Sequence, residues 1–471
     1  MTAENVLTVE SAITSVLGVA DFAQYEASVY AKYQAFAERE IIDHLNRLLS
    51  NAVYLFLLKQ WSAQCACRFH GYREITVRLK SGHPWKVLSP VFLRAKPKGQ
   101  RGRLAKRQQG ALRHLGLELS GIIKRISPAL LEICISMAVL CPSFEVAAHA
   151  LRGFGITMNE HLLQNITLRF ASLAKSVRVA CQGDEVWQKP GIRVLICVDG
   201  GRIRERRTKR GKRKSGQKRQ GYSTDWFEPR LLTISQFDDQ GQKVNAITPI
   251  LDGSCGSQED FFELLKDYLQ SINLDEASEI IFCADGGTGI WPRIDKLISE
   301  LDLKKAKRIL DYTHAKQNIN KVKKIMSDAL KLSDKESKKL SNQVRVLLWQ
   351  GDIKGIADLV REKLAGKRKA PKAALKKLDE YFGDHSRFQY KTFRDNGLPT
   401  GSGTVESAIR RVINLRIKGT GLFWKKEHAE NMIFLRSLVL TGKLKNACSK
   451  ASGVVRTMFD CNTLENLPLA A

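Results

Sequence analysis

Two apolar segments of this chain end in the same three residues, and this repetition constrains the fold more than any other feature. Val194–Val198 runs directly into Asp199-Gly-Gly, and Glu279–Ala284 runs into Asp285-Gly-Gly. An uninterrupted apolar run of this length is typical of a strand that is covered on both faces. The carboxyl ends of such strands are where open α/β sheets place their ligand sites. We therefore expect Asp199 and Asp285 to face one crevice.

The segments around these two strands alternate between strand and helix patterns. Further strands are predicted at Arg230–Phe237, Val244–Leu251 and Arg308–Leu310, and helices at Ser257–Ile272 and Trp291–Leu301. Alternation of this kind is typical of an α/β domain built on a sheet that contains parallel strands.

A third carboxylate follows much later in the chain. Glu406 lies at the start of a predicted helix, directly after a Gly-Ser-Gly loop. Three convergent carboxylates can hold two Mg²⁺ or Mn²⁺ ions about 3.5–4 Å apart, an arrangement that serves phosphoryl transfer. Each residue alone also has a simpler interpretation. An Asp-Gly pair at a strand end is commonly a turn, and Glu406 could pair with Arg410 one helical turn further on.

The net charge of +29 is concentrated in two short segments. Residues 71–110 and 201–220 each hold eleven basic side chains and one acidic side chain. A basic run is often only a solvated loop. Two such runs beside strand-like sequence favour loops that bind along a phosphate backbone. The candidate DNA contacts are Arg101, Arg103, Lys106, Arg107, Arg202, Arg204, Arg206, Arg207, Lys209, Arg210, Arg410 and Arg411.

The N-terminal third is mainly helical in pattern. A long helix is predicted over 21–60, a β-hairpin from strands at 74–79 and 85–93, a basic loop over 94–107, and a helix to Leu140. Residues 143–175 have the pattern of a helix–turn–helix pair. Such a pair either reads DNA or is an ordinary αα-hairpin, and the sequence leaves both interpretations open.

Cysteine usage points to a reducing compartment. The ten cysteines include no C-x-x-C pair, and we expect them to be reduced and structural. Cys65-Ala-Cys67, with His70 and His83 nearby, hints at zinc but lacks a second ligand pair at a defined distance. With no secretory signal pattern and no apolar run of membrane-spanning length, we expect a cytoplasmic, nucleoid-associated protein without a membrane partner.

Five segments, taken as an ordered set, resemble one known family. Three of them, Ile196-Cys-Val-Asp-Gly-Gly, Phe282-Cys-Ala-Asp-Gly-Gly and Gly401-Ser-Gly-Thr-Val-Glu-Ser-Ala, resemble the catalytic blocks of DDE transposases from bacterial insertion sequences. Leu310-Asp-Tyr-Thr-His-Ala resembles the block after the second catalytic Asp in the branch related to Mutator-like enzymes. Arg416-Ile-Lys-Gly-Thr-Gly-Leu-Phe-Trp resembles that branch's tail after the catalytic Glu. The resemblance covers roughly residues 70–440.

This resemblance implies an RNase H-like catalytic domain, with the first Asp on the central first strand and the second beyond the fourth. It assigns metal binding and catalysis to Asp199, Asp285 and Glu406. His314, with Asp311, would lie near the scissile phosphate or the flanking DNA, although His314 could equally be a helix-start histidine satisfied by Asp311. The interval of 121 residues between Asp285 and Glu406 is long for this fold, which predicts an all-helical insertion.

The expected fold is thus α/β: an RNase H-like mixed sheet interrupted by helices and preceded by a mainly helical DNA-binding region with a β-hairpin. The expected regions are 1–70 (helical), 71–185 (DNA-binding), 186–314 (core, first part), 315–395 (helical insertion), 396–445 (core, last part) and 446–471 (tail).

The function implied is that of a DNA transposase. It would bind the terminal inverted repeats of an insertion sequence and catalyse Mg²⁺-dependent hydrolysis and strand transfer into target DNA, acting as a homo-oligomer on double-stranded DNA. One alternative is a transposase-derived DNA-binding protein that no longer cuts. A more distant one is an actin-like ATP-dependent kinase, because Asp285-Gly-Gly-Thr-Gly289 also resembles a phosphate-binding loop.

Overall fold

The computed structural model describes residues 14, 16–19, 21–64, 67–94, 112–183, 192–209, 211, 216, 220–244, 246–272, 274–287 and 289–457. These residues divide into two compact units. The first is drawn from 1–138, 144–170 and 451–471, and the second from 139–143 and 171–450.

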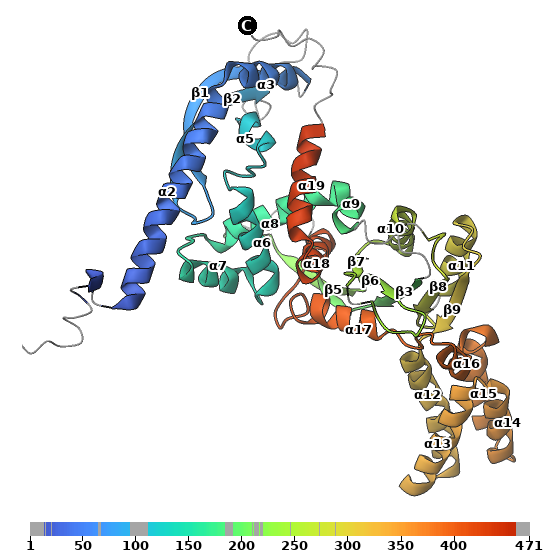
Figure 1. Cartoon of the computed structure of the whole chain (residues 1–471). Coiled ribbons are helices and arrows are strands. Elements are labelled where there is room, and N and C mark those ends of the chain that lie inside the picture. The colour runs from blue at the N-terminus through green and yellow to red at the C-terminus, as the bar shows by residue number, and fades with distance from the viewer. Residues whose placement is uncertain are drawn as a thin grey trace, which may run out of the picture. The chain divides into compact units, whose positions relative to one another are not determined.

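The first unit combines helices with a two-stranded sheet (Figure 1). Its elements are α2 (Phe22–Ser50), α3 (Ala52–Gln64), β1 (Cys67–Arg78), β2 (Pro84–Arg94), α5 (Leu115–Leu119) and α7 (Phe144–Gly153); α6 (Pro128–Leu140) and α8 (Glu160–Ala174) cross the boundary between units. The prediction of a single helix over 21–60 is wrong, because the helix is broken at Asn51. This residue ends α2, and its side-chain oxygen accepts the Tyr54 N–H at 3.0 Å to cap α3, a role that asparagine favours.

The predicted hairpin is confirmed, because β1 and β2 pair antiparallel from Cys67↔Arg94 to Arg78↔Pro84. A buried carboxylate on α2 holds its turn. Glu38, 4% exposed, accepts the backbone N–H of Ser81 at 2.8 Å, the Ser81 hydroxyl at 2.7 Å and the Trp85 indole N–H at 2.9 Å. A buried charge is tolerated only when it is hydrogen-bonded in this way.

The second unit is built on a five-stranded mixed sheet. Its strands are β3 (Arg193–Gly200), β6 (Arg230–Phe237), β7 (Ile250–Ser254), β8 (Glu279–Ala284) and β9 (Ala306–Leu310). They lie in the order β7-β6-β3-β8-β9, with β6 antiparallel to β3 and β7, and with β3, β8 and β9 parallel. The first strand of the sheet is therefore its central strand, and the carboxyl ends of β3 and β8 meet at one edge.

Two predictions for this region need correction. The strand expected over Val244–Leu251 is β7, which begins only at Ile250. Pro249 precedes it and has no N–H for a ladder. The basic segment after Asp199, expected as a loop, begins instead with a strand, β4 (Ile203–Thr208), which pairs antiparallel with β5 (Tyr222–Phe227) in a separate two-stranded sheet.

Helices make up the rest of the second unit. They are α9 (Arg178–Gln182), α10 (Gln258–Ser271), α11 (Ile290–Glu300), α12 (Tyr312–Leu330), α13 (Asp334–Gln350), α14 (Ile353–Lys363), α15 (Ala370–Tyr381), α16 (Tyr390–Asp395), α17 (Gly403–Ile409) and α18 (Lys426–Leu440), with α19 (Leu444–Thr457) crossing the unit boundary. Short turns η1 (Lys175–Val177), η3 (His385–Arg387) and the π-helical η4 (Arg410–Asn414) complete it. The helices α12–α15 follow β9 as a group (Figure 1).

One hydrophobic core extends from the sheet into α12–α15. Buried side chains of β3 and β8 belong to the same cluster as Leu310 at the end of β9, Ala315 on α12 and Leu378 on α15. The helical segment is therefore packed against the five-stranded sheet as part of the same unit.

A buried ion network fixes the edge strand β7. Asp252, fully buried, accepts two bonds from Arg178 (2.5 and 2.7 Å) and one from the Tyr268 hydroxyl at 2.6 Å. Glu430 on α18 pairs with the same arginine at 3.1 Å and with Lys175 at 2.6 Å. Because each charge has a partner, the network can tie α9 and α18 to the sheet.

The described cysteines form no disulfide, and most of them are buried. Cys67 belongs to no potential metal-binding group with His70 or His83 among the described residues, and Cys65 lies outside them. Within the described ranges, no helix has both the length and the apolar character needed to cross a membrane.

Candidate active site

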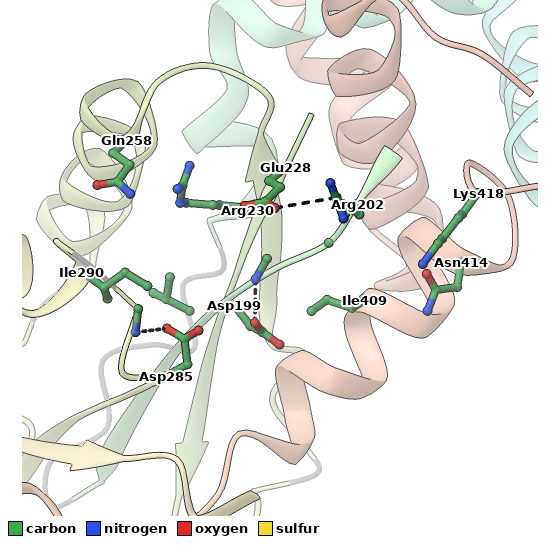
Figure 2. A pocket seen from close by; sticks show the side chains of 14 residues that line it. Asp199, Arg202, Glu228, Arg230, Gln258, Asp285, Ile290, Ile409, Asn414 and Lys418 are labelled. Carbon is green, nitrogen blue, oxygen red and sulfur yellow. Dashed lines mark hydrogen bonds and ion pairs between the residues drawn. The ribbon is translucent and has the colours of Figure 1, made fainter. Parts of the chain in front are cut away.

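A pocket of about 540 Å³ opens at the carboxyl ends of β3 and β8. Asp199, the penultimate residue of β3, and Asp285, directly after β8, both line it. Three basic side chains, Arg202, Arg230 and Lys418, line the same pocket (Figure 2). The crevice expected from the strand ends is therefore present, and it combines carboxylates with cations.

One glycine after each aspartate is closely packed. A Cβ on Gly201 would lie 2.7 Å from the end of the Ile413 side chain, which could move aside. A Cβ on Gly286 would lie 2.3 Å from the ring of Tyr381, whose hydroxyl accepts the Gly286 N–H at 3.1 Å. A side chain at Gly286 would therefore displace the Tyr381 ring.

A second group of potential ligands lies next to the pocket. Ligand atoms of Asp311, His314 and Glu406 all lie within 4.8 Å of one another. Asp311 is fully buried and caps α12: one of its oxygens accepts the His314 backbone N–H at 2.9 Å, and the other accepts the Ser402 N–H at 2.5 Å. Asp311 thereby joins the start of α12 to the loop before α17, and both of its oxygens are occupied.

His314 connects the two groups. Its backbone is capped by Asp311, while its ring Nε2 lies 3.9 Å from Oδ2 of Asp199. The Asp199 carboxylate, with further attraction from Asp311 and Asp285, raises the pKa of His314 to about 9 against the opposing effect of burial. The main chain of His314 therefore lies at a helix start, as one interpretation expects, and its ring lies beside Asp199; its place relative to DNA stays a prediction.

The surroundings of Asp285 raise the pKa of its carboxyl group. Burial raises the pKa of Asp285, and the neighbouring charges of Asp199 and Asp311 act in the same direction. The Gly287 N–H, which donates to Asp285 at 3.0 Å, and the His314 ring oppose them. An added cation would stabilise the charged form of a carboxylate in such a setting.

Glu406 is exposed on α17 and is not among the residues that line the 540 Å³ pocket. Across the described part of the chain, its carboxylate has no hydrogen bond or ion pair, so the expected alternative of a pair with Arg410 is not formed. Its nearest potential co-ligands are Asp311 and His314. A carboxylate that close to other ligands and without a partner is available to an ion.

The candidate DNA contacts fall into different settings. Arg202 lines the pocket, and Arg204 and Arg206 lie on the neighbouring β4. Arg207 is engaged within the hairpin by ion pairs with Glu205 (2.8 Å) and Asp225 (2.7 Å).

The remaining candidates are not among the pocket-lining residues or lie outside the described residues. Lys209 and Arg410 are exposed. Arg411 lines a different cavity of about 370 Å³ with Ser235 and Lys243. Arg101, Arg103, Lys106, Arg107 and Arg210 lie outside the described residues.

Two pocket cations were not among the predicted contacts. Arg230 begins β6, and the pairing Gly200↔Arg230 places it opposite the end of β3. An antiparallel strand begins beside the point where its partner ends. A prediction that β3 pairs with β6 would therefore have placed Arg230 beside Asp199. Lys418 belongs to the Arg416–Trp424 segment. The resemblance of that segment to the family was the feature of the sequence that could have indicated Lys418 as a site residue.

Comparison with known proteins adds little. No protein-family model matches the chain, and no curated protein matches it. Among solved structures, it is similar to a chain of the Drosophila P element transposase strand transfer complex. That similarity has a TM-score of 0.24 at 10% identity, over 72% of this chain and 85% of the other. A TM-score this low does not establish a shared fold. Function is therefore argued from the site itself.

Proposed function

We propose that this protein is a DDE-type DNA transposase of a bacterial insertion sequence. In this proposal it binds the terminal inverted repeats of the element, hydrolyses a phosphodiester bond, and joins the freed 3′-hydroxyl to target DNA. The observation that carries the proposal is the meeting of Asp199 and Asp285 in one pocket lined by Arg202, Arg230 and Lys418. Carboxylates beside cations suit a polyanionic substrate that reacts at phosphorus.

The topology of the sheet supports an RNase H-like assignment. The family resemblance implies a central first strand that carries the first Asp and a fourth strand followed by the second. In the sheet, β3 is both first in sequence and central, and β8 is fourth, parallel to β3 and followed by Asp285. The helices α12–α15 lie in the chain between Asp285 and Glu406, where the resemblance implies an insertion.

The residues present fit a pair of Mg²⁺ or Mn²⁺ ions. Asp199, Asp285 and Glu406 supply carboxylate oxygens, the donors that these ions prefer. Burial and the neighbouring carboxylates raise the pKa of Asp285, and a cation bound beside it would stabilise its charged form. We assign these three residues as the ligands. Two bound ions would supply positive charge to both the attacking and the leaving oxygen at phosphorus.

The surrounding residues would orient the ligands and the DNA. Asp311, with both oxygens engaged by backbone N–H groups, fixes the loop that precedes Glu406 and is assigned a positioning role. Arg202, Arg230 and Lys418 line the pocket, where their side chains would bind phosphates on either side of the reacting bond. The His314 ring, beside Asp199, would donate to a phosphate oxygen of the same strand.

An oligonucleotide strand-transfer assay tests the proposal. The wild-type protein is expected to join a labelled element-end duplex to target DNA with Mg²⁺ and not with EDTA. Asp285→Asn is expected to abolish joining while DNA binding persists. Asp358→Asn, on the far helix α14 and exposed in an ion pair with Arg361 at 2.6 Å, is the matched control and should remain active.

Two results would contradict the proposal. Strand joining by Asp285→Asn at the wild-type rate would refute the site. If neither the wild type nor Asp285→Asn nicked DNA in the presence of metal, and both bound DNA equally, the alternative of a transposase-derived DNA-binding protein would be favoured instead.

A further inference from the structure

The hairpin of β4 and β5 has two different faces. Its register pairs Arg204 with Trp226 and Thr208 with Tyr222, so these side chains share one face with Arg206. The opposite face is buried at one end, where Ile203 is fully buried and Glu205 and Phe227 are each 8% exposed. Toward its other end the exposed Arg207 forms ion pairs with Glu205 and Asp225. The buried end therefore anchors the hairpin, and the face that carries Arg204, Trp226 and Tyr222 is left to solvent.

The C-terminal part of the second unit extends this small sheet. The Arg206 N–H donates to the Trp424 carbonyl at 2.9 Å, and the Trp424 N–H donates to the Arg204 carbonyl at 3.0 Å. Trp424 is itself held by a 3.0 Å bond from its indole N–H to the Ile417 carbonyl. Its neighbour Phe423 contacts the Tyr222 ring, with centroids 5.9 Å apart. The hairpin is thus supported along β4 by the segment that contains Phe423 and Trp424.

The open face alternates aromatic rings with arginines. Trp226 is 43% exposed and Tyr222 is 42% exposed, a large exposure for such rings. The guanidinium of Arg204 lies 5.4 Å from the Trp226 ring centroid, and that of Arg206 lies 4.4 Å from the Tyr222 centroid. Cations stacked on rings keep their N–H groups free for phosphate while the ring offers a surface to a base.

This face continues into the pocket. Arg202 lines the pocket with Asp199 and also lies 5.4 Å from the Trp226 ring centroid; its position at the pocket rim is visible in Figure 2. A nucleic-acid strand whose phosphate lies at Asp199 and Asp285 would therefore reach Trp226 first and Tyr222 next.

The spacing of the rings favours an unpaired strand over a duplex. Trp226 and Tyr222 are four residues apart on one strand, which corresponds to about 13 Å. Bases in duplex DNA are stacked about 3.4 Å apart and cover one another's faces. Only bases that have left the stack can lie flat on rings so widely spaced. The charge of the arginines fits the phosphates that connect such bases.

We propose that this face binds unpaired nucleotides of the DNA strand next to the reacting phosphate. Bases stack on Trp226 and Tyr222, and Arg204 and Arg206 hold the connecting phosphates. The inference rests on the proposed function, since it concerns DNA at the same site. It extends that function by requiring a locally melted or frayed element end as the bound form.

Binding of the full-length protein to fluorescent oligonucleotides tests this inference. The probes are a single-stranded oligothymidylate and a blunt duplex of equal length, measured by anisotropy at one salt concentration. Trp226→Ala and Tyr222→Ala are each expected to weaken single-strand binding roughly 5- to 150-fold, the loss typical for one stacked base, with duplex affinity little changed. Trp226→Phe is expected to retain most of the affinity, because a ring remains.

The controls separate this inference from the proposed function. Phe154→Ala removes a ring that is more exposed (68%) from the first unit and should change neither affinity. Unchanged single-strand binding in both alanine variants, or an equal loss for the duplex, would overturn the stacking face while leaving DNA binding intact. Equal competition by polyglutamate would show a general anion surface and also overturn it. Failure of the wild type to bind either DNA would refute the proposed function itself.

Discussion

The contact between Gly286 and Tyr381 predicts a measurable penalty for one methyl group. A Cβ at position 286 would lie 2.3 Å from Cε2, 2.6 Å from Cζ and 2.9 Å from Cδ2 of the tyrosine ring. Carbon atoms in contact normally lie about 3.5–4.0 Å apart, so the ring must move by more than about 1 Å. That movement also breaks the 3.1 Å bond from the Gly286 N–H to the Tyr381 hydroxyl.

The size of the penalty follows from these losses. Overpacking of a filled site costs about 1–3 kcal/mol, and the lost hydrogen bond costs about 1 kcal/mol. Alanine restricts the unfolded chain more than glycine does, which offsets about 0.4–1 kcal/mol. Gly286→Ala is therefore expected to lower the free energy of unfolding by about 1–3 kcal/mol. It should also lower strand-joining activity, since Asp285 precedes the displaced peptide.

Urea unfolding of a double-mutant cycle measures this effect. With Tyr381→Ala in place, the added methyl group has room, so Gly286→Ala should cost at least about 1 kcal/mol less than in the wild type. Gly403→Ala is the matched control, because its Cβ would meet nothing within 4 Å. Equal costs of Gly286→Ala in the two backgrounds would refute the steric explanation of the Asp-Gly-Gly motif.

Three further predictions concern buried charges. Glu38→Gln leaves the donors of the β1–β2 turn short of an acceptor, so urea unfolding should show a loss of about 1–3 kcal/mol. Asp252→Asn leaves Arg178 buried without its main counter-charge, and the same measurement should show a loss of about 3–5 kcal/mol. Burial alone would raise the pKa of Glu430, but Lys175 and Arg178 lower it overall. Its stabilising effect should be complete above about pH 4.3 and be lost as the pH falls through the lower folded pKa. Glu430→Gln should therefore show a flatter acid limb in a pH series of unfolding measurements, and parallel limbs would contradict the assignment.

The strands that end in Asp199 and Asp285 could be predicted because their apolar runs are unbroken and their motifs repeat. The helical pattern after Asp311 was equally clear. The β4 strand was missed because a high density of arginine hides the alternation of buried Ile203 and Glu205 with exposed Arg204. Pairing between distant segments cannot be predicted from local sequence pattern. The bridge between Trp424 and Glu205 places Trp424 beside β4, and nothing in the sequence near Trp424 indicates this.

For the candidate site, the sequence indicated that two carboxylates share a crevice but not how the residues around them are arranged. Sequence spacing placed Asp199 and Asp285 at strand ends, and both line one pocket. It could not reveal that Asp311 has both oxygens engaged, or that Glu406 lies within 4.8 Å of ligand atoms of Asp311 and His314 and is not among the pocket-lining residues. Such details depend on how the start of α12 contacts the loop before α17. The residues in this contact lie more than ninety positions apart in the chain, so local sequence pattern does not reveal it.

The central claim is that Asp199, Asp285 and Glu406 hold the divalent ions that act on DNA. Anomalous diffraction from crystals of the protein with Mn²⁺ and an element-end DNA tests this claim most directly. We expect manganese peaks in contact with the carboxylates of Asp199 and Asp285, with Glu406 completing the set. Manganese held only by Asp311, His314 and Glu406, or no peak at Asp199 and Asp285, would contradict it.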